Sequence, residues 1–310
     1  MRTLHLVTCL LLASTSLAAQ RTRRIQPGQS PQASPEAQLW VSGYNSNQVH
    51  RFSRDTGAPS GPGLNAPGAQ SIVQGSDGFT YVVAEEQNAV LRFYGTRPNG
   101  PFVFDDPSTS ADETGGLDGP TAAVFGPDGN LYVASFNGDS VLRYDGQSGA
   151  FLGVFVASRQ NGLDGPDAGM RFGPDGNLYV PSFNSNQVLR YDGSNGANMG
   201  VFIPAFSGGL LQPRVLLFRP DGELWVSSFG SNELLAFDAL GNFRRRVLRL
   251  PGLTGFAIGP KDGLLYVASS RSNRVARYNP HSGAFLDNFI PTGSDGIDAA
   301  TYIAFVQPRR

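Results

Sequence analysis

From Leu39 onward, one sequence unit recurs six times, and this repetition limits the folds that the chain can adopt. Its clearest copies begin with Gly-Pro-Asp-Gly-Asn-Leu-Tyr-Val at Gly126 and at Gly173, and a Val-Leu-Arg-Tyr-Asp-Gly segment follows each of them. One aromatic ring occupies the same place in every copy, at intervals of 41 to 51 residues: Trp40, Tyr81, Tyr132, Tyr179, Trp225 and Tyr266. A period of this length is typical of architectures in which each repeat is one structural unit that packs on its neighbours.

Each copy predicts four short β-strands. In the third copy these are Thr121 to Phe125, a strand around Leu131 to Val133, Val141 to Tyr144, and Phe151 to Val156. Alternating apolar residues and glycine-rich turns favour strands over helices. Asp-Gly suits the tight turn after the first strand, so we interpret its aspartates as turn formers rather than calcium ligands: Asp77, Asp128, Asp175, Asp221 and Asp262.

A further polar column falls between the second and third predicted strands. It consists of Asn47, Asn88, Asp139, Asn186, Asn232 and Asn273. Asparagine and aspartate side chains readily bond to nearby backbone groups, so we expect this column to hold its own loop in each copy.

The two ends of the repeat region complement each other. The first copy starts at its second strand, Leu39 to Gly43, whereas the C-terminal segment Asp298 to Phe305 resembles the first strand of the third copy. A first strand supplied from the far end would close a ring and leave no unpaired strand at the junction. The chain is therefore predicted to be all-β: a six-bladed β-propeller with four-stranded antiparallel blades, closed by the C-terminal strand completing the first blade.

The N-terminal region predicts export. Residues 1–19 combine Arg2, a short apolar run and the small residues Ala18-Ala19, as in a signal peptide. Residues 20–37 are rich in Gln, Pro, Ser and Arg and are expected to be a flexible leader, and residues 38–310 form a single propeller. The only cysteine, Cys9, lies within the predicted signal. We expect a secreted or periplasmic monomer with no membrane insertion.

Net charge argues against one class of partner. The formal charge is −1, with 24 basic and 25 acidic residues, so nothing predicts the basic face that nucleic-acid binding needs.

The repeat resembles a known group. Gly-Pro-Asp-Gly-Asn-Leu-Tyr-Val, followed by Ser-Asn-Gln-Val-Leu-Arg-Tyr at Ser185 to Tyr191, is similar to NHL-type repeats and to the wider group of SMP-30 (gluconolactonase)-like proteins and streptogramin lyases. The resemblance covers residues 38 to 307. It implies a six-bladed propeller with its ligand site at the channel mouth, on a fold that carries lactonases, lyases, sugar dehydrogenases and binding modules.

Departures from the repeat at that mouth are the candidate site residues. The loop after the second strand contributes Tyr44, Glu85, Phe136, Phe183, Phe229 and Ser270, with Glu86 and Arg271 beside two of them. The innermost strands start at Gln70, Thr121, Asp167, Arg214, Thr254 and Thr301. Our ligand-binding candidates are Arg214, Glu85, Glu86, Arg271, Tyr44, Phe136, Phe183 and Phe229. Because the phenylalanines recur with the repeat, packing between blades is an equally open role for them.

Histidine positions limit the catalytic options. His5 lies in the predicted signal, His50 in a third strand and His281 in a turn on the opposite face, so the mouth has no histidine base or zinc ligand. A lactonase of the SMP-30 type instead uses a divalent cation such as calcium, held by oxygen ligands. The weak candidates for such ligands are Glu85, Asp167 and Asp298, which do not match that family's ligand motif residue by residue.

Together these patterns favour a binding module over an enzyme. We expect an exported propeller that recognises a small molecule, glycan or peptide at its loop face, without a catalytic constellation or a firm cofactor. The alternative is a divalent-metal-dependent SMP-30-like lactonase or esterase, or a related lyase. A third hypothesis is a purely structural envelope component, for which the loop face would be dispensable.

Overall fold

The computed structural model describes residues 37–106, 108 and 111–308. The predicted signal peptide and the leader up to residue 36 lie outside the described residues, so the proposed processing remains a prediction.

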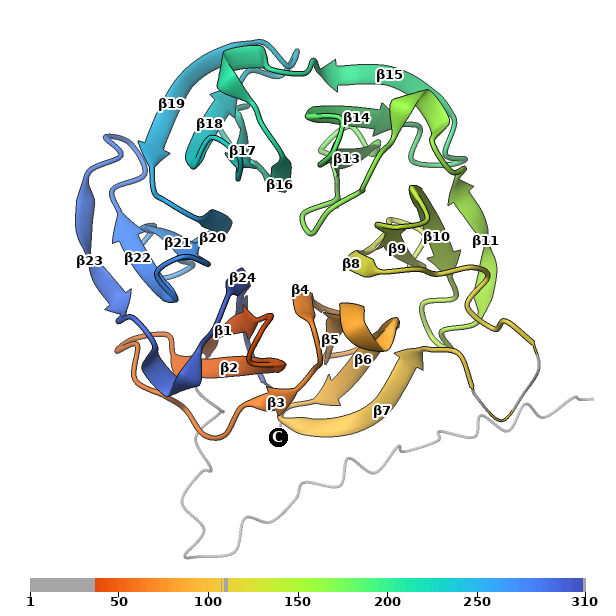
Figure 1. Cartoon of the computed structure of the whole chain (residues 1–310), viewed down its shortest axis with the longest axis horizontal. Coiled ribbons are helices and arrows are strands. Elements are labelled where there is room, and N and C mark those ends of the chain that lie inside the picture. Colours follow the sequence, from red (N-terminus) through yellow and green to blue (C-terminus); the bar gives the residue numbers. More distant parts are fainter. Residues whose placement is uncertain (1–36, 107, 109–110, 309–310) are drawn as a thin grey trace, which may run out of the picture. The chain divides into compact units, whose positions relative to one another are not determined.

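Six four-stranded antiparallel sheets stand around a central axis as the blades of a ring (Figure 1). The strands of each blade are given from the innermost outward. Blade 1 consists of β24 (Ala300–Val306), β1 (Gln38–Gly43), β2 (Gln48–Ser53) and β3 (Leu64–Asn65), and blade 2 of β4 (Ala69–Gln74), β5 (Phe79–Ala84), β6 (Ala89–Tyr94) and β7 (Arg97–Val103). Blade 3 consists of β8 (Pro120–Phe125), β9 (Leu131–Ser135), β10 (Ser140–Tyr144) and β11 (Phe151–Val156).

Blades 4 to 6 follow the same order. Blade 4 consists of β12 (Arg171–Phe172), β13 (Leu178–Ser182), β14 (Gln187–Tyr191) and β15 (Asn198–Ile203). Blade 5 consists of β16 (Pro213–Phe218), β17 (Leu224–Ser228), β18 (Glu233–Phe237) and β19 (Phe243–Arg249). Blade 6 consists of β20 (Leu253–Ile258), β21 (Leu265–Ser269), β22 (Arg274–Tyr278) and β23 (Phe285–Ile290). Four 3-10 turns lie in the loops: η1 (Glu85–Gln87), η2 (Gln160–Gly162), η3 (Ser207–Gly209) and η4 (Ser294–Gly296). No helix in the described part of the chain is long and apolar enough to span a membrane.

The predicted closure is confirmed. The C-terminal strand β24 pairs antiparallel with β1, with Leu39 opposite Phe305 and Val41 opposite Ile303. Ile303 is buried in the apolar cluster that also contains Tyr266 and Phe289 of blade 6. The last strand of the chain therefore completes the first blade and buries apolar surface against the last one.

The repeated aromatic ring is the centre of each blade's packing. All six rings are buried, and the four tyrosines donate their hydroxyl protons to the aspartate of the preceding turn over 2.7–3.0 Å. The other carboxylate oxygen of each turn aspartate accepts the N–H two residues further on, as at Asp128 and Asn130. These aspartates form turns, as the sequence predicted.

The polar column between the second and third strands has a different role from the one expected. Each residue has a left-handed backbone, and its side-chain oxygen accepts an N–H from the loop that leads into the next blade. We call this segment, which precedes each innermost strand, the lead-in loop. The six bonds measure 2.7–2.9 Å and join Asn47 to Gly68, Asn88 to Gly119, Asp139 to Gly165, Asn186 to Gln212, Asn232 to Gly252, and Asn273 to Ala299. They tie each blade to its neighbour around the whole ring, and Asn186 also holds its own loop by donating from Nδ2 to the Asn184 carbonyl over 3.2 Å.

Candidate functional site

The channel mouth holds a cavity of about 300 Å³. Its lining consists of Tyr44, Gln70, Glu85, Thr121, Phe136, Asp167, Phe183, Arg214, Phe229, Ser270, Ala299 and Thr301. All six residues of the predicted loop column are present, and five of the six that were expected to start the innermost strands. The tertiary structure therefore brings the two columns together at one end of the ring.

A repeated backbone bond positions the loop column. In every blade the residue after the second strand donates its N–H to a lead-in carbonyl over 2.9–3.1 Å, as Tyr44 does to Ala299 and Phe183 to Gly165. The partner carbonyls belong to the same lead-in residues that the polar column binds. Six backbones are thus held alike, while the side chains they present differ.

A buried ion pair lies at the floor of the cavity. Arg214 at the start of β16 donates from Nε to Asp167 Oδ2 over 2.8 Å and from Nη2 to Asp167 Oδ1 over 3.2 Å. Asp167 is 2% exposed, and its Oδ1 also accepts the N–H of Ala168. Both carboxylate oxygens of Asp167 are therefore occupied by hydrogen bonds, which fix the position of the Arg214 guanidinium.

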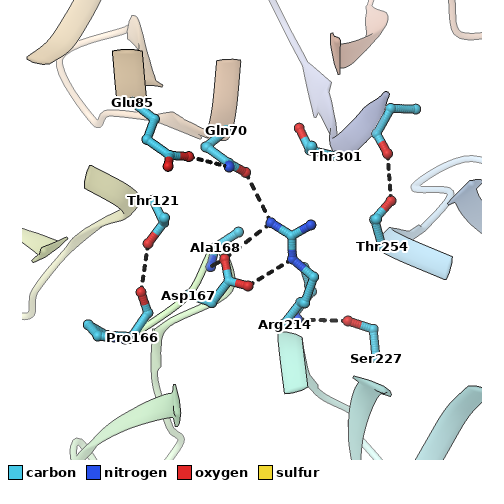
Figure 2. A network of polar contacts seen from close by, with 12 residues as sticks. Gln70, Glu85, Thr121, Pro166, Asp167, Ala168, Arg214, Ser227, Thr254 and Thr301 are labelled. Carbon is cyan, nitrogen blue, oxygen red and sulfur yellow. Dashed lines mark hydrogen bonds and ion pairs between the residues drawn. The ribbon is translucent and has the colours of Figure 1, made fainter. Parts of the chain in front are cut away.

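The same guanidinium connects opposite sides of the channel. Arg214 Nη2 donates to Gln70 Oε1 over 3.2 Å, and Gln70 Nε2 donates to Glu85 Oε2 over 2.6 Å (Figure 2). The chain Asp167–Arg214–Gln70–Glu85 therefore joins blades 4 and 5 to blade 2. Nη1 of Arg214 has no hydrogen-bond partner among the residues that the structure describes. Gln70 was not among the predicted site residues, and its only signal in the sequence was its place in the inner-strand column.

The threonines of the inner strands link blades. Thr121 donates to the Pro166 carbonyl over 2.7 Å, Thr254 to Ala300 over 2.7 Å and Thr301 to Ala69 over 2.8 Å. Each acceptor belongs to the next blade, as Figure 2 shows for Thr121. These hydroxyl protons are already used, so they are not free donors to a ligand.

An aromatic wall covers the side of the cavity formed by blades 3 to 5. The ring centroids of Phe136 and Phe183 are 5.9 Å apart, and those of Phe183 and Phe229 are 6.2 Å apart. The Arg214 guanidinium lies 5.8 Å from the Phe229 centroid. Phe183 thus packs between the other two rings, and all three line the cavity, so packing between blades is confirmed and their ligand-binding role stays a prediction.

The opposite side is polar and acidic. Burial raises the pKa of Glu85, although the hydrogen bond from Gln70 acts in the other direction. Burial and the nearby charges of Glu85 and Glu86 raise the pKa of Tyr44. The cavity is therefore lined by apolar rings on one side and by polar, titratable side chains on the other.

Three candidates are not part of this cavity lining. Glu86 and Arg271 are exposed beside it, and exposed Asp298 accepts a bond from Asn273 Nδ2 over 3.1 Å. The three weak metal candidates are therefore dispersed: Glu85 and Asp167 line the cavity and Asp298 does not. Across residues 37–308, apart from the undescribed positions, no group of three or more His, Cys, Asp or Glu side chains could hold a metal ion.

Comparison with known proteins supports the fold alone. No protein-family model matches the chain, and no curated protein sequence does. Among solved structures, a chain of a nidogen/laminin complex is 15% identical over 88% of this chain and all of that one, with a TM-score of 0.68. Virginiamycin B lyase from Staphylococcus aureus is 15% identical over 89% of this chain and 90% of that one (TM-score 0.58). A putative 6-phosphogluconolactonase from Bacteroides uniformis is 20% identical over 87% and 99% (TM-score 0.55). The chain shares the propeller fold of the group that its repeats resemble, and these similarities assign no activity.

Proposed function

We propose that this chain is an exported recognition module that binds a small ligand at the channel mouth without transforming it there. The observation that carries the proposal is the two-sided cavity, with an aromatic wall facing Arg214 and Glu85. Apolar rings combined with a few fixed polar groups are typical of sites that bind and orient small molecules. Export rests on the predicted signal peptide.

The size and polarity of the cavity favour a sugar. A volume of about 300 Å³ is at the lower end of ligand pockets and suits one or two rings. A pyranose has an apolar C–H face that can stack on Phe183, and a hydroxyl edge that can accept from Arg214 Nη1 and donate to Glu85. The terminal sugar of a glycan therefore fits this cavity. A small molecule, or a peptide side chain with one apolar face and one polar edge, would fit it in the same way.

The polar groups of the mouth suit the holding of a ligand, and one carboxyl group among them is left for proton exchange. Asp167 is engaged by Arg214 and by the Ala168 N–H, which leaves Glu85 as the carboxyl group of the lining that could exchange a proton. The dispersed carboxylates also give the metal-dependent lactonase no specific support.

The test is a panel of malto-, cello-, xylo- and chito-oligosaccharides, screened by thermal shift and by saturation-transfer NMR. A ligand that binds only the folded state raises the melting temperature in a saturable way. We expect Phe183→Ala to weaken the binding of a panel member about tenfold or more, whereas Phe285→Ala on outer strand β23 leaves it unchanged. Absence of binding by every sugar, or equal losses in both variants, would contradict the proposal for glycans.

The same thermal-shift assay distinguishes the binding module from the metal-dependent enzyme. Ca²⁺, Mg²⁺, Mn²⁺ and Zn²⁺ are titrated against the wild type, Glu85→Ala and Asp298→Ala. A saturable rise with one ion, lost in either variant, would favour the metal-dependent hydrolase. Consumption of a bound sugar, followed by NMR, would show that the mouth is catalytic.

A further inference from the structure

Blade 1 departs from the repeat at two neighbouring positions outside the mouth cavity. Its second strand ends in Gly43, where blades 3 to 6 have Ser135, Ser182, Ser228 and Ser269. Its third strand carries His50 opposite Val41, in the place where blades 2 to 5 have Leu91, Leu142, Leu189 and Leu235. A buried imidazole thus replaces an apolar side chain in one blade alone.

The imidazole bridges two polar side chains that are far apart in the sequence. His50 Nε2 lies 2.9 Å from the Ser46 hydroxyl in the turn between β1 and β2. His50 Nδ1 lies 3.3 Å from Asp295 Oδ2 in η4, just before the closing strand. The His50 side chain is 2% exposed and that of Asp295 27%. Ring closure therefore assembles a serine, a histidine and an aspartate in series.

Gly43 makes this arrangement possible. A Cβ at that position would lie 2.1 Å from Ser46 Oγ and 3.1 Å from His50 Nε2. Either distance is shorter than ordinary van der Waals contact, so a serine like that of the other blades could not coexist with this pair. The two departures from the repeat depend on each other.

Hydrogen-bonding chemistry sets the direction of the series. A carboxylate at Asp295 can only accept, so in the tautomer that satisfies this contact the imidazole proton lies on Nδ1. Nε2 is then an acceptor for the hydroxyl proton of Ser46 at 2.9 Å, beside the Gly43 carbonyl, which lies 3.2 Å from the same Oγ. A hydroxyl that donates to an imidazole nitrogen has the relation of a nucleophile to its general base. In blade 4 the matching turn, Phe183-Asn184-Ser185-Asn186, has no imidazole, and Ser185 bonds to Ser182 instead.

We propose that Ser46, His50 and Asp295 form a second site, which transfers acyl groups from small carboxylic esters. Ser46 is partly exposed in its turn, and the proposal requires that an ester reach its Oγ from that exposed side. The N–H of Ser46 has no acceptor among the described residues, and it can donate to the oxyanion that forms. The site is separate from the mouth cavity and does not depend on the function proposed there.

The chemical steps balance without a cofactor. Ser46 Oγ attacks the carbonyl carbon, its proton moves to His50 Nε2, and the bond to the alcohol breaks as that proton passes to the leaving oxygen. A water molecule then repeats the sequence on the acyl-serine and releases the carboxylic acid. Ser46 and His50 are the catalytic residues, and Asp295 is a positioning residue that fixes the imidazole tautomer.

The test labels the full-length protein with an ethoxy fluorophosphonate, followed by intact mass and peptide mapping. We expect one adduct at Ser46, no adduct in Ser46→Ala, and labelling about 100-fold slower in His50→Leu. Ser185→Ala is the matched control and should label like the wild type. Because leucine occupies this place in four other blades, His50→Leu is expected to fold. Hydrolysis of p-nitrophenyl acetate should follow the same order.

Absence of an adduct, an adduct at another serine, or unchanged labelling of His50→Leu would overturn the proposal. If His50→Leu lacks a cooperative melt, ¹⁵N NMR of the wild-type imidazole decides, because the chain has only three histidines. We expect the Nδ1-protonated tautomer at His50, its loss in Asp295→Asn and its return in Asp295→Glu. An Nε2-protonated His50 in the wild type would overturn the proposal, because Nε2 could then not accept the Ser46 proton and the three side chains would form only a structural hydrogen-bond network.

Discussion

The two halves of the channel mouth have the same backbone arrangement but present side chains of different chemistry. Blades 3 to 5 present Phe136, Phe183 and Phe229, whereas blades 1, 2 and 6 present Tyr44, Glu85 and Ser270. All six residues make the same backbone bond to a lead-in loop, at 2.9–3.1 Å. This position accommodates different side chains, because the ring is held by these backbone bonds and by the polar column.

The halves are nevertheless joined. Arg214 and Asp167 come from the aromatic half, and their bonds continue through Gln70 to Glu85 in the polar half.

Removal of residues 298–310 should have the largest effect. The deletion takes away β24, so β1 loses its partner strand and the cluster around Ile303 is opened to water. We expect loss of cooperative unfolding, or oligomers that pair the free strand edge. Circular dichroism melts and light scattering after gel filtration measure this. A monomer with the melting temperature of the full chain would contradict the role of closure.

Asp167→Ala should strongly destabilise the fold. It leaves the guanidinium of Arg214, whose side chain is only 11% exposed, without its partner. Breaking one side of a buried pair typically costs about 3–5 kcal/mol. Urea denaturation measures the free energy of unfolding. The double variant Asp167→Ala/Arg214→Ala should lose less than the sum of the single losses, and additive losses would show that the two side chains are not coupled.

The polar half should respond to pH through Glu85. Burial raises the pKa of Glu85, so the folded state binds this proton more tightly than the unfolded chain. Its contribution to stability is then greatest below the unfolded pKa, about 4.3, and declines as pH rises through the raised value. Glu85→Gln keeps an acceptor for Gln70 and should melt a few degrees higher at pH 7.

Melting curves from pH 4 to pH 8 test this behaviour. The difference between Glu85→Gln and the wild type should shrink toward pH 4. A difference that is constant across this range would mean that Glu85 does not titrate as its burial implies. Phe183→Ala, in the aromatic half, is the control and should show no such trend.

Two lead-in residues, one in each half, should give the smallest effect. Gln212 and Ala299 have φ of 50° and 53°, at positions where the other lead-in loops have Gly68, Gly119, Gly165 and Gly252. Glycine relieves the steric cost of this conformation but adds entropy to the unfolded chain. We expect Gln212→Gly and Ala299→Gly each to stabilise by about 0.5 kcal/mol in urea denaturation. A lower free energy of unfolding in either variant would indicate that the side chain it removes makes stabilising contacts.

Much of the fold and part of the site could be predicted from the sequence. The blades, the closing strand and the turn aspartates follow from local pattern, because strand period and turn chemistry depend on residues close in the chain. The repeat also places Tyr44, Phe183 and Arg214 at the mouth, since equivalent positions of equivalent blades share one end of the ring. Glu86 and Arg271 were expected there as well, but their side chains lie outside the cavity lining.

The blade architecture, and the end of the ring at which variable residues gather, therefore follow from the amino-acid pattern alone. The contacts between side chains required the folded ring: Arg214 with Gln70 across the channel, Asn47 with the next blade, and Ser46 with His50 and Asp295. The contact between His50 and Asp295 joins residues 245 positions apart. A repeat fixes each residue's place on its own blade, whereas contacts between blades depend on ring closure and on the rotamers of the partners.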